Sequence, residues 1–192
     1  MDLNLAGKVV VITGATANIG RGIALDFANE SAKLVLVGRD EEAGKRVVSD
    51  ALERGAEQAV FVKADMLEPS APQRILQAVA EIGTLDVLVN NVGSTVGAGY
   101  FVDSTPESWH GDIEINLMTT LRMTHAALPG MIERGAGRII NIGSTAAIVG
   151  DYMHVVYSAA KGAVHSFTKV LAKEVGQHGI TVNCVAPYGT FA

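Results

Sequence analysis

The sequence predicts a three-layer, doubly wound α/β domain, in which one parallel sheet lies between two layers of helices. Short runs of β-branched residues recur along the chain, and each is followed by a longer segment whose apolar residues have helical spacing. This alternation is typical of β-α-β units joined by right-handed crossovers. The chain has 192 residues, 48% of them hydrophobic. That is enough for a sizeable core, so we expect a single domain over residues 1–192.

The first half of the chain alternates in this way. Strands are predicted over four short apolar runs of the kind that a parallel sheet buries on both faces, at 8–13, 32–38, 59–65 and 85–91. Helices are predicted between them, at 19–30, at 41–55 with Gly55 as the C-terminal cap, and from near Pro69 to 83. A glycine-rich loop over 92–105 follows the fourth strand.

The second half predicts a long helix over about 107–134, a strand at 137–144, a loop, a helix from about 155 to 176, and a last strand at 180–186. Both helices have apolar residues on more than one side, so each must be covered on more than one side. We therefore expect a homo-oligomer, a dimer or tetramer, built on these two helices. The alternative is that chain beyond residue 192 covers these two helices.

Composition argues against several classes of protein. The net charge is -5, without basic runs, so nucleic-acid binding is not expected. Cys184 is the only cysteine, and the five histidines lack the spacing of a helical metal pair, so we expect neither a disulfide nor a metal site. No stretch approaches the ~18 apolar residues of a membrane span, and the start does not have the pattern of a signal peptide. We expect a cytoplasmic protein without membrane contact.

The stretch TGATANIG (13–20) joins the first strand to the first helix, where free amides at the helix start favour an anion. A nucleotide-hydrolysing P-loop is excluded, because Gly20 is followed by Arg21 and not by lysine. Asn18 stands where a middle glycine is expected in a dinucleotide-binding turn, and asparagine readily adopts a left-handed backbone. Taken alone, the stretch is either a phosphate-binding turn or an ordinary structural one.

Tyr157 and Lys161 are four residues apart, so they share one face of a helix. A phenol normally ionises near pH ~10, and a fixed ammonium one turn away favours phenolate, which makes a tyrosine usable as an acid or base. Ser144 ends a predicted strand at the carboxyl edge of the sheet, where it can converge with Tyr157 on one oxygen. The alternative is a surface Tyr–Lys pair.

Together these motifs resemble the short-chain dehydrogenase/reductase (SDR) family over essentially the whole chain. The opening turn is similar to the family's TGxxxGxG and departs from it at Asn18. The other matches follow at family-like spacings: Asp65, NNVG (90–93), Asn116, Ser144 and YSAAK (157–161). The resemblance implies a Rossmann-type fold and an NAD(P)-dependent oxidoreductase that interconverts a secondary alcohol and a ketone.

The resemblance also implies the roles of individual residues. Ser144 would hydrogen-bond the substrate oxygen, Tyr157 would transfer the proton, and Lys161 would also hold the nicotinamide ribose. Asn116 would position a water in the proton relay; otherwise it is a helix-interior residue bonded to local backbone. The residues implied to bind the cofactor are Gly14, Asn18, Ile19, Gly20, Arg39, Asp65, Met66, Asn91, Val92, Gly93, Tyr157, Lys161 and Pro187. Asp65 and Met66 would line the adenine pocket, unless Asp65 is simply a helix cap.

The end of the second predicted strand bears on the choice of cofactor. Gly38 stands where NAD-type members of the family have an acid, and Arg39 follows it, placed to bind the 2′-phosphate of NADP. NADP(H) is therefore preferred. NAD(H) remains possible, because three acids follow directly at 40–42.

The last stretch departs from the family. NCVAPYGTFA partly matches PGxxxT: Pro187 is present, but Tyr188 replaces the glycine and Ala192 stands where threonine is expected. Family members usually continue, so we expect a fragment without its C-terminal part and substrate lid. The main alternative function is a catalytically inactive dinucleotide-binding regulatory or scaffold subunit. An epimerase or dehydratase of the extended branch is a weaker alternative, because its TGxxGxxG requires glycine at Ala17.

Overall fold

The computed structural model describes residues 3–188, which include one six-stranded parallel sheet. Its strands are β1 (Val9–Thr13), β2 (Lys33–Gly38), β3 (Gln58–Lys63), β4 (Leu85–Asn90), β5 (Gly137–Ile142) and β6 (Ile180–Val185). Their order is β3-β2-β1-β4-β5-β6, and all neighbouring pairs are parallel. The predicted doubly wound fold is confirmed, although β3 and β5 each end two residues earlier than predicted.

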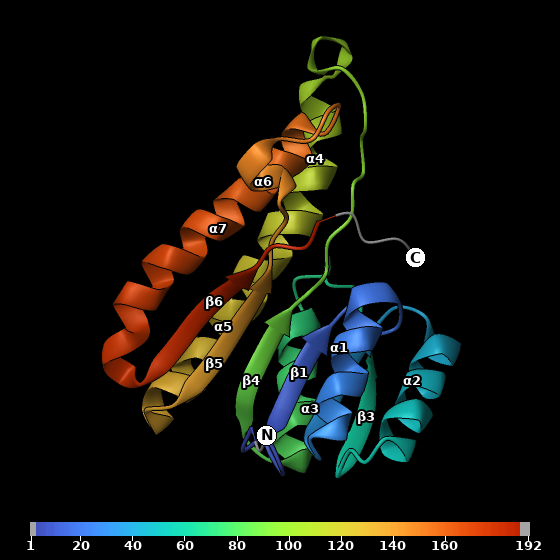
Figure 1. Cartoon of the computed structure of the whole chain (residues 1–192), viewed down its shortest axis with the longest axis vertical. Coiled ribbons are helices and arrows are strands. Elements are labelled where there is room, and N and C mark those ends of the chain that lie inside the picture. Colours follow the sequence, from blue (N-terminus) through green and yellow to red (C-terminus); the bar gives the residue numbers. More distant parts are fainter. Residues whose placement is uncertain (1–2, 189–192) are drawn as a thin grey trace.

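Helices cover both faces of this sheet (Figure 1). On one face lie α3 (Ala71–Ile82), α5 (Thr119–Arg134) and α7 (Val155–Val175), and on the other lie α1 (Asn18–Asn29) and α2 (Glu41–Glu53). Successive strand residues point to opposite faces, so Val9 and Val11 join the first core while Val10 and Ile12 join the second. This double burial explains why β1 is apolar throughout.

The third helix starts later than the sequence predicts. It begins at Ala71 and not near Pro69, with Ser70 as its N-cap and Pro72 in the first turn. The preceding residues form a separate turn, in which the Glu68 N–H donates to the Asp65 carbonyl at 3.0 Å. That turn keeps 65–68 out of the helix. The helix predicted at 41–55 ends at Glu53, and Gly55 follows with a φ of 105°.

The helix predicted over 107–134 is interrupted. It consists of α4 (Pro106–Ile113), a π-helical turn η2 (Glu114–Met118) and α5. π-turns insert one extra residue into a helix and are frequent at functional sites, and a hydrophobic pattern does not reveal them. The structure also places three short helical segments outside the predicted helices: η1 (Phe101–Asp103), α6 (Ala146–Val149) and η3 (Gly176–His178).

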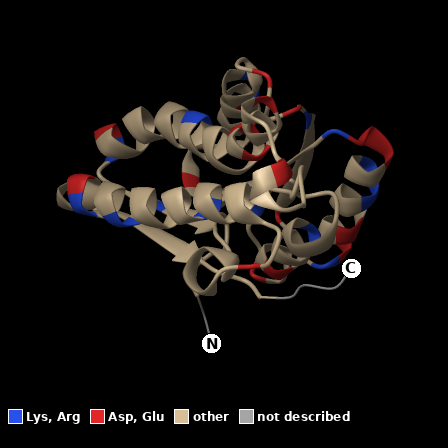
Figure 2. Ribbon diagram, turned by 90° about the horizontal axis from the view of Figure 1, so that it is seen from above, with Lys and Arg blue, Asp and Glu red and all other residues tan. Residues whose placement is uncertain are grey.

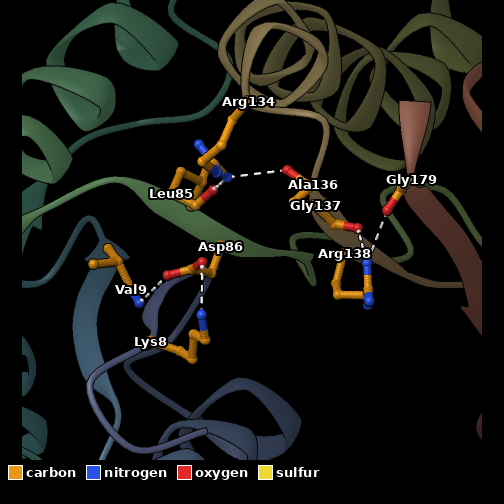
Figure 3. A network of polar contacts seen from close by, with 9 residues as sticks. All are labelled: Lys8, Val9, Leu85, Asp86, Arg134, Ala136, Gly137, Arg138 and Gly179. Carbon is orange, nitrogen blue, oxygen red and sulfur yellow. Dashed lines mark hydrogen bonds and ion pairs between the residues drawn. The ribbon is translucent and has the colours of Figure 1, made fainter. Parts of the chain in front are cut away.

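Polar contacts join the strands at the amino edge of the sheet (Figure 3). The Asp86 carboxylate accepts the Val9 N–H at 3.0 Å and lies 3.4 Å from Lys8 Nζ. Asp86 is the extra residue where the β1–β4 register shifts. Arg134 donates to the Leu85 carbonyl from the end of α5. These contacts hold the strands together at the amino edge of the sheet, which lies opposite to the loops at the carboxyl ends of the strands.

Charged residues of both signs are interspersed along the ribbon (Figure 2). Within residues 3–188, every helix is too short or too polar to cross a bilayer. On α5 and α7 some large apolar side chains remain exposed, among them Ile132 at 38% and Val170 at 55%.

Candidate active site

A cleft of about 700 Å³ opens at the carboxyl ends of the strands, where the segments that follow all six strands converge. Residues that follow β1 and β4 line it, and these two strands are the neighbours at which the strand order reverses, the point where ligands of open α/β sheets bind. The lining includes Ser144 and all the residues predicted to bind a dinucleotide: Gly14, Asn18, Ile19, Gly20, Arg39, Asp65, Met66, Asn91, Val92, Gly93, Tyr157, Lys161 and Pro187. Asn116 does not line the cleft.

The turn after β1 depends on three residues with unusual backbone requirements. Gly14 has a φ of 67° and Asn18 a φ of 46°, so the expected left-handed asparagine is confirmed. A Cβ built on Gly20 would overlap the Gly14 carbonyl oxygen. Glycine at 20 therefore lets the first turn of α1 pack directly against the end of β1.

The amino end of α1 is open to an anion. Its N-cap, Ala17, provides no side-chain hydrogen bond, and the first turn contains no acidic residue. The first N–H groups of a helix have no partner within it, and they stabilise negative charge. The residues around this end line the cleft, so the site suits a phosphate group.

Two side chains lock the turns after β1 and β4 together. The Asn91 amide nitrogen donates to the carbonyls of Thr13 (3.0 Å) and Gly14 (3.1 Å). In return, Thr13 Oγ1 accepts the N–H groups of Asn91 (2.9 Å) and Val92 (3.2 Å). Thr13 was not among the predicted site residues, because the need for a hydroxyl here depends on β4 lying beside β1.

At the end of β2 the structure separates one basic residue from the acids that follow it. Arg39 is exposed and lines the cleft, and the acids at 40–42 do not. Asp40 caps α2 by accepting the Ala43 N–H at 3.0 Å, an interaction that lowers the pKa of its carboxyl. Glu41 lies 3.3 Å from Lys63 Nζ. A Cβ built on Gly38 would lie 2.6 Å from the Thr16 methyl group, so Thr16 leaves no room for a side chain there.

The two residues predicted at the adenine pocket lie side by side in the chain after β3. Met66 is 5% exposed, and Asp65 is half-buried. One Asp65 carboxylate oxygen accepts the Leu67 N–H at 3.0 Å. Asp65 closes this local turn and does not cap α3, whose N-cap is Ser70.

Ser144 lies two residues beyond the end of β5, on a segment held from two sides. Its Oγ accepts the N–H of Ala146, the first residue of α6, at 3.1 Å. Its own N–H donates to His165 Nε2 at 3.4 Å, and a Cβ on Gly143 would overlap that nitrogen. Burial is the main cause that lowers the pKa of His165, which favours the neutral ring that this bond requires. His165 was not among the predicted residues.

Tyr157 and Lys161 both lie on α7 and both line the cleft, so the shared face expected from their spacing is present. Lys161 is 3% exposed, and its Nζ donates to the Ile142 carbonyl at 2.9 Å. Burial lowers the pKa of Lys161 to about 8, so the side chain is mostly protonated at pH 7. The buried cation thus belongs to the residue one helical turn after Tyr157.

Asn116 lies on the π-turn, fully buried behind the cleft wall. Its Oδ1 accepts the Ser94 N–H at 3.1 Å, and its Nδ2 donates to the Ser94 carbonyl at 2.7 Å and to the Asp112 carbonyl at 3.0 Å. A Cβ on Gly93 would lie 2.7 Å from Lys161 Nζ and 2.8 Å from Asn116 Oδ1. Gly93 therefore leaves room for both side chains, and Asn116 also bonds local backbone, the alternative that the sequence offered.

Several cleft residues were not predicted: Thr16, Ala64, Ile115 and Asp151. Thr16 lies within the motif that indicated the site, so its place two residues after Gly14 was an available signal. The others belong to loops or helices whose distance from the cleft depends on the sheet order. Over residues 3–188, no three His, Cys, Asp or Glu side chains are grouped in a way that could hold a metal ion.

Comparison with known proteins agrees with this geometry. Residues 8–191 match the family model of the short chain dehydrogenases. The chain is 38% identical over 183 residues to an L-fucose dehydrogenase of Oryctolagus cuniculus, a match that covers 95% of this chain and 62% of that protein. The chain therefore spans less than two thirds of that relative's length.

Two solved structures have the same fold. L-sorbose reductase from Gluconobacter frateurii, in complex with NADPH and L-sorbose, has a TM-score of 0.92 and 33% identity over 97% of this chain and 71% of that chain. A xylitol dehydrogenase bound to NAD⁺ has a TM-score of 0.90 and 28% identity over 95% of this chain and 70% of that chain.

Proposed function

The chain belongs to the short-chain dehydrogenase family, and we propose that it is an NAD(P)-dependent oxidoreductase that interconverts a secondary alcohol and a ketone. One observation carries the proposal. A single cleft gathers the turn suited to a phosphate group and the residues Ser144, Tyr157 and Lys161. The structural neighbours bound to NAD⁺ and NADPH support a nicotinamide dinucleotide as the cofactor.

The proposed chemistry follows from these three side chains. A bound nicotinamide dinucleotide would supply or accept the hydride, which no side chain provides. The hydroxyls of Ser144 and Tyr157 would hydrogen-bond the substrate oxygen, where negative charge develops as a ketone is reduced. Tyr157 would transfer the proton, a step that typically contributes ~10²- to 10⁴-fold. The buried Lys161 ammonium would stabilise negative charge on the phenol oxygen.

The test of this function separates binding from turnover. Tyr157→Phe removes the proposed acid and keeps the ring, so it should abolish oxidation of NADPH by a panel of ketones while NADPH still binds. Tyr152→Phe is the matched control: Tyr152 is exposed, bonds Tyr100 at 2.9 Å and does not line the cleft. NADPH binding without turnover of any ketone by the unaltered protein would favour the inactive regulatory subunit instead.

We propose that NADP(H) is the preferred cofactor. Arg39 is the basic side chain at the end of β2 that lines the cleft, and a guanidinium binds phosphate with paired hydrogen bonds. An acid at 38 would meet Thr16, and the neighbouring Asp40 is engaged as a helix cap. Arg39→Ala should therefore weaken NADPH binding at least tenfold more than NADH binding, measured by fluorescence titration. Equal losses would refute the preference.

We also propose that α5 and α7 form a contact between copies of this chain. Both helices have exposed apolar side chains beside their buried faces, including Ile132 and Val170, and such patches often mark interfaces. Light scattering should give the mass of a dimer or tetramer, and Val170→Lys should lower it. A monomeric mass for the unaltered protein would contradict this assignment.

A further inference from the structure

Asp112 is a buried carboxylate that the proposed reaction does not use. It lies in α4, one helical turn before Asn116, is 1% exposed and does not line the cleft. The ion pairs formed within residues 3–188 do not include it. Burying a carboxylate without a cation is costly, so its hydrogen-bond partners indicate what this residue contributes.

Those partners are two backbone amides of the loop that follows β4. One carboxylate oxygen of Asp112 accepts the Val96 N–H at 3.0 Å, and the other accepts the Gly97 N–H at 3.3 Å. Hydrogen bonds to an ionised acceptor are stronger than those between neutral groups. The buried Asp112 therefore holds this part of the loop through its backbone, although the Val96 residue is 58% exposed.

Side chains from other elements hold the backbone of the loop that follows β4. Over the stretch 92–97, backbone N–H groups donate to the side chains of three residues, Thr13, Asn116 and Asp112. Thr13 fixes the start of the stretch at the end of β1. Asn116 and Asp112 fix its middle and end, and they lie one turn apart on the same long helix. A segment held in this way moves when one of its few anchors is lost.

Movement of this loop would displace backbone that contacts the proposed catalytic residues. Ser94 and Thr95, between the anchors, line the cleft, and Ser94 makes two hydrogen bonds with the Asn116 amide. Gly93, one residue earlier, lies against both Asn116 Oδ1 and Lys161 Nζ. A displaced stretch 96–97 would shift the cleft wall and the carbonyl that orients Asn116.

We propose that Asp112 is a positioning residue for the proposed reaction. Its carboxylate accepts the N–H groups of Val96 and Gly97, and we term this pair of hydrogen bonds the clasp. The clasp holds the stretch 93–97 against Asn116 and Lys161. The catalytic consequence rests on the proposed function, whereas the clasp itself is a property of the folded chain. Asp112 acts through the loop and does not itself line the cleft.

The clasp is tested first on the unaltered protein with NADPH bound, by amide hydrogen exchange followed residue by residue with NMR. The amides of Val96 and Gly97 should exchange at least about tenfold more slowly than those of Thr95 and Ala98, which have no hydrogen-bond acceptor among residues 3–188. Equal exchange at all four positions would overturn the clasp, and this result needs no variant that must fold.

The positioning role is tested with Asp112→Asn, which keeps the side-chain shape and one acceptor oxygen but turns an amide NH₂ toward a backbone N–H. We expect exchange at 96–97 to rise about tenfold and kcat to fall at least about tenfold, with the Kd for NADPH within about threefold of the unaltered value. Asp103→Asn, at an exposed carboxylate that caps no helix, is the control and should change none of these.

The outcomes distinguish the clasp from the proposed function. A lower melting temperature with unchanged kcat and unchanged exchange at 96–97 would reduce Asp112 to a purely structural residue and overturn the proposal. Slow exchange at 96–97 in a protein that binds NADPH but turns over no ketone would refute the proposed function and leave the clasp standing. Fast exchange at 96–97 together with normal turnover of ketones would overturn the clasp and leave the proposed function standing.

Discussion

Removal of the Lys161 charge should change the pH dependence of stability in a specific direction. Burial lowers the pKa of Lys161 from its ordinary 10.5 to about 8 in the folded protein. At ~1.4 kcal/mol for each tenfold change in proton affinity, the charged side chain costs the folded state about 3 kcal/mol below pH 8. Above pH 8 the folded protein releases the proton while the unfolded chain retains it, so folding stability rises toward pH 10.5.

Urea unfolding without nucleotide, at about pH 7 and about pH 9.5, measures this difference. The rise in the free energy of unfolding between the two pH values should be about 2 kcal/mol larger for the unaltered protein than for Lys161→Met. Comparing pH dependences cancels the packing change and the lost hydrogen bond to Ile142, because both act at either pH. Lys169→Met removes an exposed lysine from the same helix and should keep the full rise. An equal rise in Lys161→Met would refute the argument that burial destabilises the cation.

Three further predictions concern the turns and the site. Gly20→Ala should weaken NADPH binding at least about tenfold, because the added methyl overlaps the Gly14 carbonyl, whereas Gly22→Ala, where a Cβ meets nothing within 4 Å, should bind normally in the same titration. In urea unfolding, Asn18→Ala should lose about 1 kcal/mol, because alanine lacks the short polar side chain that lets asparagine tolerate a left-handed backbone. Asn18→Gly should not lose stability, because glycine has no Cβ and adopts this backbone without strain. Burial and then two neighbouring lysines lower the pKa of His165 in the folded protein. Below about pH 6.5 the unfolded chain therefore takes up a proton more readily than the folded one, so the free energy of unfolding should fall. His165→Gln should reduce that loss.

Local pattern determined much of this protein. The strands and most helices follow from runs and spacings within a few residues, because side-chain periods of two and 3.6 decide which faces are buried. The left-handed turn at Asn18 is likewise set by what one residue type tolerates. The shared face of Tyr157 and Lys161 follows from a spacing of four on one helix. Each of these features depends on neighbours in the chain, so it could be predicted without the fold.

The tertiary structure decided the rest, because the remaining contacts join segments far apart in the chain. Lys161 is buried against the end of β5, and both Lys161 and Asn116 lie close to Gly93 because that residue has no side chain. Asp112 is an ordinary acidic residue in a helical pattern until the loop after β4 brings two amides onto its carboxylate. The π-turn that carries Asn116 also leaves no trace in hydrophobic spacing. Such features need the sheet order and the packing of loop on helix, which no short stretch of sequence contains.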